Sequence, residues 1–260
     1  MRKILLVKTG TTLPLLRAYK GDFDKWVVKN LPPEWRARVD VVDVASGERL
    51  PALSGLAGVI LTGSHAMVTD HAAWIEGTAE WLRTAVRACV PTLGICFGHQ
   101  LLAYSLGGLV GDNPFGLEFG TVVVAPTEAG EKDALLGDFQ GPFKAHMCHQ
   151  QSVLRAPVGA VILARTRREP CAAFSVGGSA WGVQFHPEFD CRTMKVYILT
   201  HKRALAAQGQ DVSGLFRSCM ETGAGHVVFS RFTDVIGGHS RSFREACASS
   251  DPLKKCVRAV

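Results

Sequence analysis

The sequence predicts an α/β fold: a mostly parallel β-sheet flanked by helices, with an antiparallel extension. In the first half of the 260 residues, short continuous apolar runs alternate with segments of helical periodicity. Strands buried on both faces of a parallel sheet have such runs, and their alternation with helices is typical of βαβ units. From Thr121 to Gln184, short apolar segments instead follow one another with only turn residues between them. Successive strands without long helices indicate an antiparallel layer added to the α/β domain.

The parallel strands are expected at four apolar runs: Ile4–Val7, Val39–Val44, Gly58–Thr62 and Pro91–Cys96. A helix is expected from Ala72 to Arg87. Its apolar residues recur at spacings of four, three and four, which puts them on one helix face; they are Ile75, Ala79, Leu82 and Val86.

The antiparallel strands are expected at Thr121–Ala125, Ala160–Ala164, Ala172–Val176 and Trp181–Phe185. A helical pattern returns after Asp190. The side chains that share its face are Met194, Tyr197, Ile198, His201 and Leu205. Together these elements predict one domain over residues 1–236.

Residues 237–260 are expected to form a basic tail that contains glycine and serine and whose composition allows disorder. The chain has a net charge of +6 and a pI of about 9.0. The tail holds five basic and two acidic residues, so half of the excess charge lies outside the predicted domain. The rest of the sequence has no basic cluster that would indicate a nucleic-acid partner, and we expect none.

Apolar stretches reach only about five to eight residues, whereas a membrane helix needs about 20. Lys8 and Gly10 interrupt the N-terminal apolar run before it reaches the length of a secretory signal. The eight cysteines include no CxxC pair and are expected to be reduced thiols. We therefore expect a cytoplasmic protein that does not associate with membranes.

Cys96 lies in a pattern that is typical of a nucleophile. The segment PTLGICFGHQLL runs from a predicted strand into a helical pattern, with Gly94 and Gly98 two residues on either side of Cys96. This is the GxSxG elbow with cysteine in place of serine, in which small residues allow a strained strand-to-helix turn. The sulfur would stand at a helix N-terminus, where the helix dipole favours a thiolate. The alternative is a buried cysteine between two helix-boundary glycines.

The segment WGVQFHPEF supplies the other groups that a thiol nucleophile needs. His186 would follow a strand, and Glu188 lies two residues further on. A histidine can accept the proton of the thiol and later protonate the leaving amine, and a carboxylate orients the histidine. Because the carboxyl ends of parallel strands meet at one edge of a sheet, Cys96, His186 and Glu188 can converge. A histidine at the end of a strand can also be merely structural.

The sequence GICFGHQLLA followed by GVQFHPEF resembles the class I glutamine amidotransferase family, whose members use a Cys, His, Glu triad. The resemblance covers about residues 1–236 and implies a flavodoxin-like three-layer fold. It also implies a hydrolase that uses no cofactor. Cys96 would attack the γ-amide of glutamine, His186 would protonate the departing ammonia, and water would release glutamate from the γ-glutamyl thioester.

The resemblance also implies two backbone N–H donors for the oxyanion. One is expected at Phe97, after the nucleophile, and the other at Gly63 in LTGSHAMV. Many family members have two glycines followed by proline in that loop, whereas this chain has Gly63, Ser64 and His65. The second donor is therefore less well defined by the sequence than the first.

The expected substrate-binding residues are Gln100, His149, Gln150 and Gln151. AHMCHQQSV resembles the loop that reads HGD in amidotransferases feeding a synthetase, but no acid follows His149. Glu118 in GLEFG is a candidate structural or binding carboxylate. His146, Cys148 and His149 are not expected to hold a metal, because side chains of adjacent residues diverge and no partner cluster has zinc spacing.

Three functions remain open from the sequence. The first is a glutamine amidotransferase that passes ammonia to a separate synthase. The second is a stand-alone γ-glutamyl peptidase or hydrolase that acts on γ-glutamyl amides or peptides. The third is a non-catalytic binding module on the same fold, which the intact set Cys96, His186 and Glu188 argues against.

Overall fold

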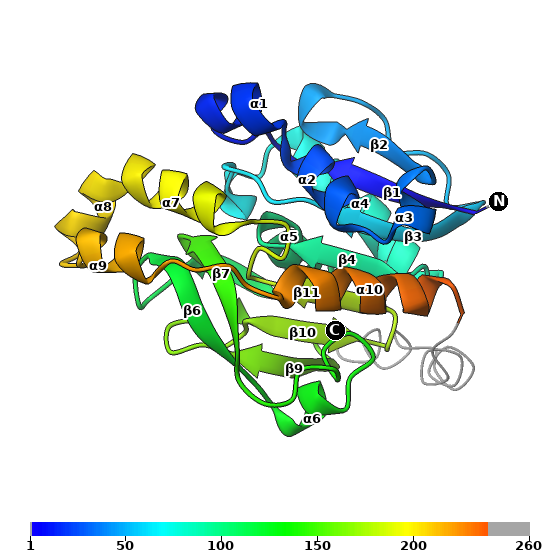
Figure 1. Ribbon diagram of the computed structural model, residues 1–260. Coiled ribbons are helices and arrows are strands. Elements are labelled where there is room, and N and C mark those ends of the chain that lie inside the picture. The colour runs from blue at the N-terminus through cyan, green and yellow to red at the C-terminus, as the bar shows by residue number, and fades with distance from the viewer. Residues whose placement is uncertain (1, 239–260) are drawn as a thin grey trace.

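Nine strands form one sheet in the computed structural model, which describes residues 2–238 (Figure 1). Their spatial order is β2 (Val39–Asp43), β1 (Lys3–Lys8), β3 (Leu56–Leu61), β4 (Thr92–Ile95), β11 (Ala180–Val183), β10 (Ala173–Val176), β9 (Ala160–Arg165), β6 (Glu118–Pro126) and β7 (Phe143–His149). Neighbours from β2 to β11 are parallel, and those from β11 to β7 are antiparallel. The predicted antiparallel extension therefore continues the parallel sheet through β11.

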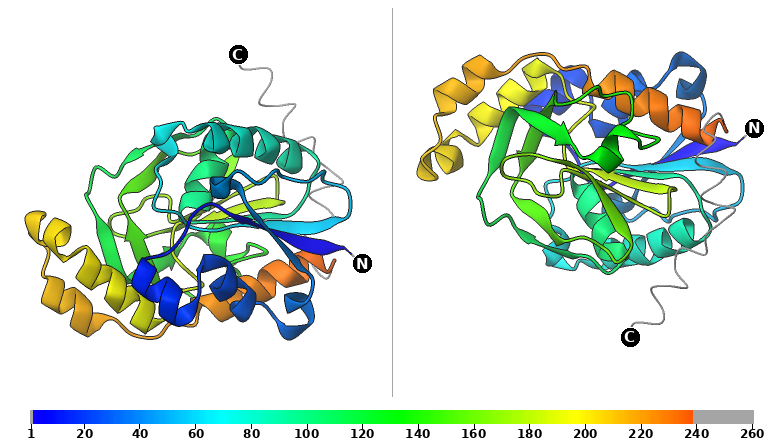
Figure 2. Two further views of the ribbon diagram at one scale, coloured as in Figure 1. Left: turned by 90° about the horizontal axis from the view of Figure 1, so that it is seen from above. Right: turned by 90° about the horizontal axis from the view of Figure 1, so that it is seen from below.

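Helices cover both faces of the parallel part (Figure 2). The described helices are α1 (Pro14–Lys20), α2 (Phe23–Asn30), α3 (Pro33–Arg36), α4 (Ala73–Arg87), α5 (Phe97–Ser105), α6 (Glu128–Glu131), α7 (Cys191–Thr200), α8 (Lys202–Ala207), α9 (Val212–Ser218) and α10 (Ala224–Ile236). Helices α4 and α5 lie on one face, and α2, α3 and α10 lie on the other. Helices α7 and α9 contact β6 in the antiparallel part. This is the predicted three-layer α/β arrangement.

The apolar stripe predicted for the helix after β3 is the buried face of α4. Ile75, Ala79, Leu82 and Val86 are at most 1% exposed. They belong to the core layer that includes residues of β1 and β3, among them Leu5. Burying a large aliphatic side chain contributes about 1.5–3 kcal/mol relative to exposure. The spacing of these residues thus fixes α4 against the sheet.

The segment Ala145–Val153, expected as a loop, is instead a pair of strands. Strand β7 ends at His149, and β8 (Gln151–Arg155) begins two residues later. Strand β8 pairs with β5 (Leu109–Asp112) in a separate two-stranded sheet. The prediction was wrong because His146 and His149 are buried polar residues with partners inside the protein, so apolar alternation does not mark the strand. The predicted tail lies outside the described residues from position 239 onward.

An ion pair joins α1 to the start of α7, two of the elements beside the carboxyl edge of the sheet. Lys20 Nζ lies 2.6 Å from Asp190 Oδ2. Asp190 also caps α7, since its Oδ1 accepts a hydrogen bond from Thr193 N–H at 2.8 Å. Burial raises the pKa of Asp190, but hydrogen bonds from Lys20 and Thr193 lower it by more, so that the pKa is about 2. The cap is therefore charged at neutral pH, where it favours the helix N-terminus.

Buried histidines should make the fold sensitive to acid. Burial lowers the pKa of His99 to about 3 and that of His146 to about 4, while the unfolded chain binds the proton near 6.5. The stability from these groups is complete above pH 6.5 and is lost as the pH falls, because the unfolded state binds more protons. We expect His99 alone to reduce the free energy of unfolding by about 3 kcal/mol between pH 7 and pH 4. Urea denaturation across this range, with His99→Leu showing a smaller pH dependence, checks the prediction.

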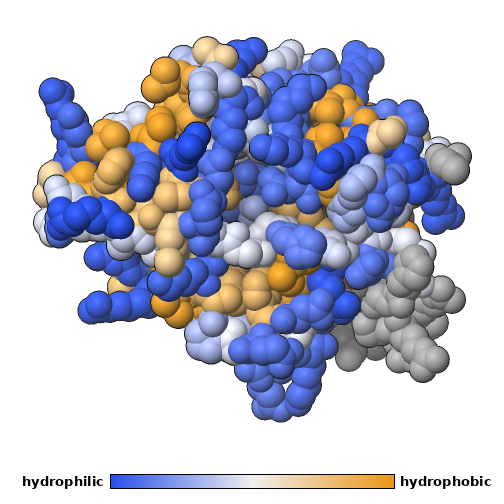
Figure 3. Space-filling view, in the orientation of Figure 1, coloured by the Kyte–Doolittle hydropathy of each residue, from blue (hydrophilic) through white to orange (hydrophobic). Residues whose placement is uncertain are grey.

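None of the described helices is both long and apolar enough to span a bilayer. On the face of the molecule in Figure 3, hydrophilic residues predominate and hydrophobic residues emerge in several separate groups. Exposed apolar residues of this kind are normal on protein surfaces and do not by themselves indicate a partner.

Candidate active site

Cys96 stands in a strained turn between β4 and α5. Its φ is 51° and its ψ is −102°, a region that residues with a side chain rarely adopt. The turn requires glycines on both sides. A Cβ on Gly94 would lie 2.3 Å from Gly98 O, and a Cβ on Gly98 would lie 2.7 Å from Leu61 Cβ. The geometry is that of the elbow predicted from the sequence, with the cysteine ahead of the helix.

His186 and Glu188 form a buried pair next to Cys96. His186 Nδ1 lies 2.8 Å from Glu188 Oε1, and both residues are at most 4% exposed. The ring of His186 stacks on Phe189 with the ring centroids 4.0 Å apart. Its backbone N–H donates to His146 O at 2.8 Å. Hydrogen bonding, stacking and the backbone anchor thus hold the imidazole in one orientation.

The charge state of His186 depends on its two partners. Burial lowers its pKa, but attraction to Cys96 and Glu188, together with hydrogen bonds to both, raises the pKa to about 10. The contacts with Cys96 and Glu188 thus favour the protonated imidazole, with one ring nitrogen bonded to Glu188.

The loop after β3 approaches both catalytic candidates. A Cβ on Gly63 would lie 3.1 Å from His186 Cε1 and 3.8 Å from Cys96 Cβ. Thr9 fixes this loop, since its Oγ1 donates at 3.0 Å to Thr62 O and lies 3.1 Å from Gly63 O. Among residues 2–238, neither Gly63 N–H nor Phe97 N–H donates a hydrogen bond to another residue. Two backbone N–H groups close to Cys96 thus have no partner within the described part of the chain.

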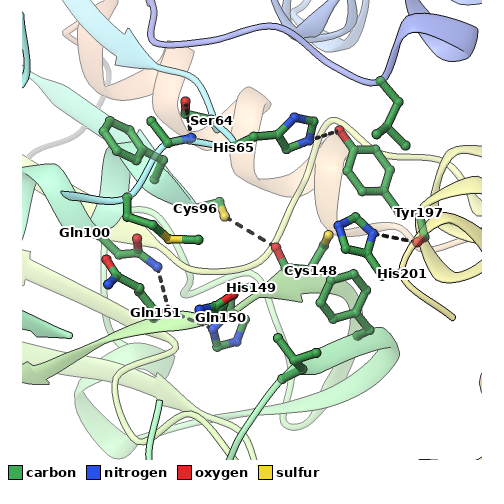
Figure 4. A pocket seen from close by; sticks show the side chains of 16 residues that line it. Ser64, His65, Cys96, Gln100, Cys148, His149, Gln150, Gln151, Tyr197 and His201 are labelled. Atoms are coloured by element: carbon green, nitrogen blue, oxygen red, sulfur yellow. Dashed lines mark hydrogen bonds between the residues drawn. The ribbon is translucent and has the colours of Figure 1, made fainter. Parts of the chain in front are cut away.

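A cleft of about 170 Å³ opens beside Cys96 (Figure 4). Its lining includes the predicted residues Cys96, Phe97, Gln100, His149, Gln150 and Gln151. Cys96 Sγ faces the carbonyl of Cys148 at 3.8 Å. The cleft thus brings the nucleophile candidate and all four expected substrate-binding residues together at the carboxyl edge of the sheet.

One end of the cleft is lined by glutamine side chains. Gln100 Nε2 donates to Gln151 O at 2.7 Å and to Gln184 Oε1 at 2.9 Å. Gln151 Nε2 donates to Thr69 Oγ1 at 2.8 Å. The other amide atom, Gln151 Oε1, is buried and accepts no hydrogen bond from the described residues. A buried acceptor is costly unless a ligand supplies a donor. This end, on the left in Figure 4, is suited to a polar group that carries N–H.

The opposite end is apolar and aromatic. Its lining residues are Leu13, His65, Leu117, Phe119, Tyr197 and His201. Tyr197 OH lies 3.1 Å from His65 Nε2, and the Tyr197 ring lies 5.1 Å from that of Phe189, on which His186 stacks. The catalytic imidazole candidate is therefore on the same side as this aromatic end.

Sequence reasoning did not identify Tyr197, His65 or Cys148 as parts of the site. Tyr197 and His201 share the face of the helix predicted after Asp190, and that face was the available signal for them. His65 lies in the predicted oxyanion loop, but its contact with Tyr197 joins residues 132 positions apart and leaves no local pattern. In residues 2–238, no group of three or more His, Cys, Asp or Glu side chains is arranged to hold a metal.

Comparison with protein families and known proteins yields consistent similarities. The family model described as "Glutamine amidotransferase class-I" matches residues 22–204. A glutamine-hydrolysing GMP synthase of Aeropyrum pernix is 42% identical over 144 residues, which are 55% of this chain and 26% of that protein. The corresponding enzyme of Thermus thermophilus is 37% identical over 123 residues, or 47% of this chain and 24% of that protein. The chain thus spans about a quarter of the length of these relatives.

Solved structures share the fold at lower sequence identity. A glutamine amidotransferase of Thermotoga maritima superposes with a TM-score of 0.65 at 23% identity, over 96% of this chain and 100% of its own. A protein of Thermoplasma acidophilum described as a GMP synthase subunit superposes with a TM-score of 0.63 at 16% identity, over 96% of this chain and 99% of its own. Both similarities extend along nearly the whole length of the chain.

Proposed function

The chain belongs to the class I glutamine amidotransferase family, and on this premise we propose that its cleft hydrolyses the side-chain amide of glutamine with Cys96 as the nucleophile. The observation that carries the proposal is the strained Cys96, which lines the cleft, together with the buried His186–Glu188 pair in contact with it. The neighbouring loop at Gly63 and the unused N–H of Phe97 support it.

In the first step Cys96 Sγ attacks the δ-carbon of glutamine. The positive charge of His186 beside the sulfur supports attack as a thiolate, the reactive form of cysteine. The carbonyl oxygen takes on negative charge as the C–S bond forms. Backbone N–H groups of Phe97 and Gly63 are the proposed donors to this oxygen, and loss of one such donor costs about 2.7–4 kcal/mol in comparable sites.

In the second step the C–N bond breaks and His186 donates its proton to the departing nitrogen, which leaves as ammonia. A water molecule then gives a proton back to His186 and attacks the thioester carbonyl, so glutamate departs and the thiolate is regenerated. Glu188 remains ionised and orients the ring through Nδ1, as the carboxylate of a hydrolytic triad does. His186 thus gives one proton to the departing ammonia and takes one proton from the attacking water.

The glutamine-lined end suits the α-carbon end of the substrate. Gln151 Oε1 needs a donor, and the α-ammonium of glutamine would supply one. Gln100 acts through Gln151, because its amide bonds the Gln151 carbonyl. His149 lines the cleft, but hydrogen bonds inside the protein occupy both its ring nitrogens. We therefore propose that Gln150 and Gln151 contact the substrate directly and that Gln100 and His149 support them.

A substrate panel tests the proposal. Purified protein is incubated with glutamine, asparagine and glutamate γ-methylamide, and release of ammonia or methylamine is measured. Hydrolysis of glutamine with little hydrolysis of asparagine is expected, because the shorter side chain cannot reach both Cys96 and the glutamine-lined end. Absence of hydrolysis of any γ-glutamyl compound would refute the function.

We propose that a separate synthase accepts the ammonia. Support comes from the Thermoplasma acidophilum protein, which is described as belonging to GMP synthase and matches over 99% of its length. The curated relatives are named as glutamine-hydrolysing GMP synthases, and the chain resembles about a quarter of each. Co-purification from the source cells followed by a glutaminase assay with and without the captured protein would identify such a partner.

The aromatic end of the cleft favours a second candidate, the hydrolysis of γ-glutamyl amides with an N-substituent. His186 must protonate the leaving nitrogen, so any substituent on it lies on the His186 side, where the walls are Leu117, Phe119 and Tyr197. These residues accommodate a neutral apolar amine better than a charged one. A higher kcat/KM for γ-glutamyl phenethylamide than for glutamine would favour this candidate over the first.

A further inference from the structure

A buried cluster of charged side chains lies behind the glutamine-lined end of the cleft. Glu118 begins β6, and its cross-strand partner His149 ends β7. Glu169, in the turn between β9 and β10, lies on the other side of the imidazole. The three side chains are at most 6% exposed. Two carboxylates and one imidazole are thus removed from water together, which is costly unless hydrogen bonds satisfy them.

A hydrogen bond joins His149 to Glu118, and a longer charge contact joins it to Glu169. His149 Nε2 lies 3.2 Å from Glu118 Oε2, and His149 Nδ1 lies 3.9 Å from Glu169 Oε2. Thr166 Oγ1 donates to Glu118 Oε1 at 2.7 Å. Ser152 Oγ donates to Glu169, whose other oxygen accepts from the N–H of Cys171 at 2.9 Å. The two glutamates are therefore held by different strands and turns, with the imidazole between them.

The proton positions follow from the partners. The carbonyl of Gln151 can only accept, so the 2.9 Å contact with His149 Nδ1 means that Nδ1 carries a proton. One further proton must lie between His149 Nε2 and Glu118 Oε2, because two acceptors alone would repel each other. Burial raises the pKa of the third member, Glu169.

The cluster meets the cleft at His149, which lines it, and His149 also bonds the main chain of the cleft wall. The carbonyl oxygen of Gln151 accepts from His149 Nδ1 at 2.9 Å and from Gln100 Nε2 at 2.7 Å. Gln100 lies in the first turn of α5, directly after the nucleophile candidate. The same stretch of chain carries the Cys148 carbonyl that faces Cys96 Sγ. The position of the wall formed by residues 148–151, relative to Cys96, therefore depends on His149.

We propose that Glu118, His149 and Glu169 are positioning residues that hold the cleft wall formed by residues 148–151 at the distance from Cys96 at which the substrate binds. Glu118 and Glu169 do not line the cleft, and they act through His149 and the Gln151 carbonyl that it bonds. This role rests on the proposed hydrolysis of glutamine. It assigns the unit to substrate binding and not to the chemical step.

The test compares Glu118→Ala and Glu118→Gln in the full-length protein. Alanine leaves His149 Nε2 without a partner, and we expect KM for glutamine to rise at least tenfold while kcat changes less than threefold. In Glu118→Gln, the side-chain oxygen can accept from Thr166 and the side-chain nitrogen can donate to a neutral His149. The Glu118→Gln variant should therefore have a KM within threefold of the parent. The double variant Glu118→Ala/His149→Ala should be no worse than the poorer single variant, because the two residues act as one unit.

Asp133→Ala is the matched control. Asp133 is another buried carboxylate, which accepts from Leu135 N–H at 2.7 Å and lies 3.2 Å from Trp181 Nε1, and it does not line the cleft. This variant should lower the melting temperature without changing KM. The positioning role is overturned if Glu118→Ala also lowers the melting temperature without changing KM. It is likewise overturned if the KM of Glu118→Gln stays as high as that of Glu118→Ala.

Hydrogen–deuterium exchange separates failure of this role from failure of the proposed function. A parent protein that hydrolyses no γ-glutamyl compound refutes the function. In that case the exchange of backbone amides in residues 146–153 still decides about the cluster. Faster exchange there in Glu118→Ala than in the parent, with unchanged exchange in β1 and β3, supports the role, and unchanged exchange in residues 146–153 overturns it.

Discussion

Cys96→Ala is expected to reduce glutamine hydrolysis by at least about 10,000-fold. Removing the nucleophile of a comparable hydrolase has a cost of this order or larger, because no other group can form the covalent intermediate. Alanine has the same Cβ as cysteine, so the strained φ of 51° at this position should cost no more than in the parent. The variant should therefore fold with a melting temperature close to that of the parent, and kcat/KM from an ammonia-release assay gives the loss.

Cys89→Ala provides the matched control for Cys96→Ala. Cys89 also has a positive φ of 51°, and it lies after α4, outside the lining of the cleft. This substitution should leave glutamine hydrolysis within threefold of the parent. Activity within tenfold of the parent in Cys96→Ala would contradict the nucleophile assignment.

Glu188→Gln is expected to lower kcat by about 100-fold to 10,000-fold, with little change in KM. The glutamine side chain has nearly the same shape as that of Glu188. It carries no negative charge, however, and its nitrogen donates a hydrogen bond where the carboxylate oxygen accepts one. In a comparable triad, the change from a carboxylate to an amide cost about 10,000-fold because the histidine took the wrong tautomer. Steady-state kinetics with glutamine measure this effect.

The pH profile gives Glu188→Gln a second readout. Glu188 is one of two groups whose attraction raises the pKa of His186 to about 10. Without it the pKa of His186 falls, so His186 loses its proton at lower pH and the alkaline limb of kcat/KM should move to lower pH. Asp190→Asn, two residues along the chain, is the control, since asparagine also caps α7 and the profile should stay unchanged. A harmless Glu188→Gln would place the orienting carboxylate elsewhere.

The nucleophile turn and the parallel strands could be predicted because short local patterns encode them. Gly94, Cys96 and Gly98 are close in sequence, and the structure explains the glycines by contacts under 3 Å that a side chain would make. The buried parallel strands are continuous apolar runs, which depend on burial on both faces and not on distant partners. The family could be predicted because a second local motif, GVQFHPEF, follows this turn in the sequence.

The wall of the cleft was harder to predict because distant residues form it. Glu118 and Glu169 meet at His149 from different strands and turns, and neither glutamate lies in a pattern that indicates burial. The strands β7 and β8 were missed because His146 and His149 are buried polar residues, which interrupt the alternation that marks a strand. Sequence patterns thus reveal candidate catalytic groups that lie in a local turn, while groups held by long-range hydrogen bonds are found only from the structure.

Covalent trapping tests the central claim most directly. The protein is treated with a chloroketone analogue of glutamine, and the modified peptide is identified by mass spectrometry, with and without excess glutamine. We expect one equivalent of label on Cys96 alone among the eight cysteines, with protection by glutamine. Label spread over several cysteines, or label on Cys96 that glutamine does not reduce, would contradict the assignment of Cys96 as the nucleophile of a glutamine-hydrolysing site.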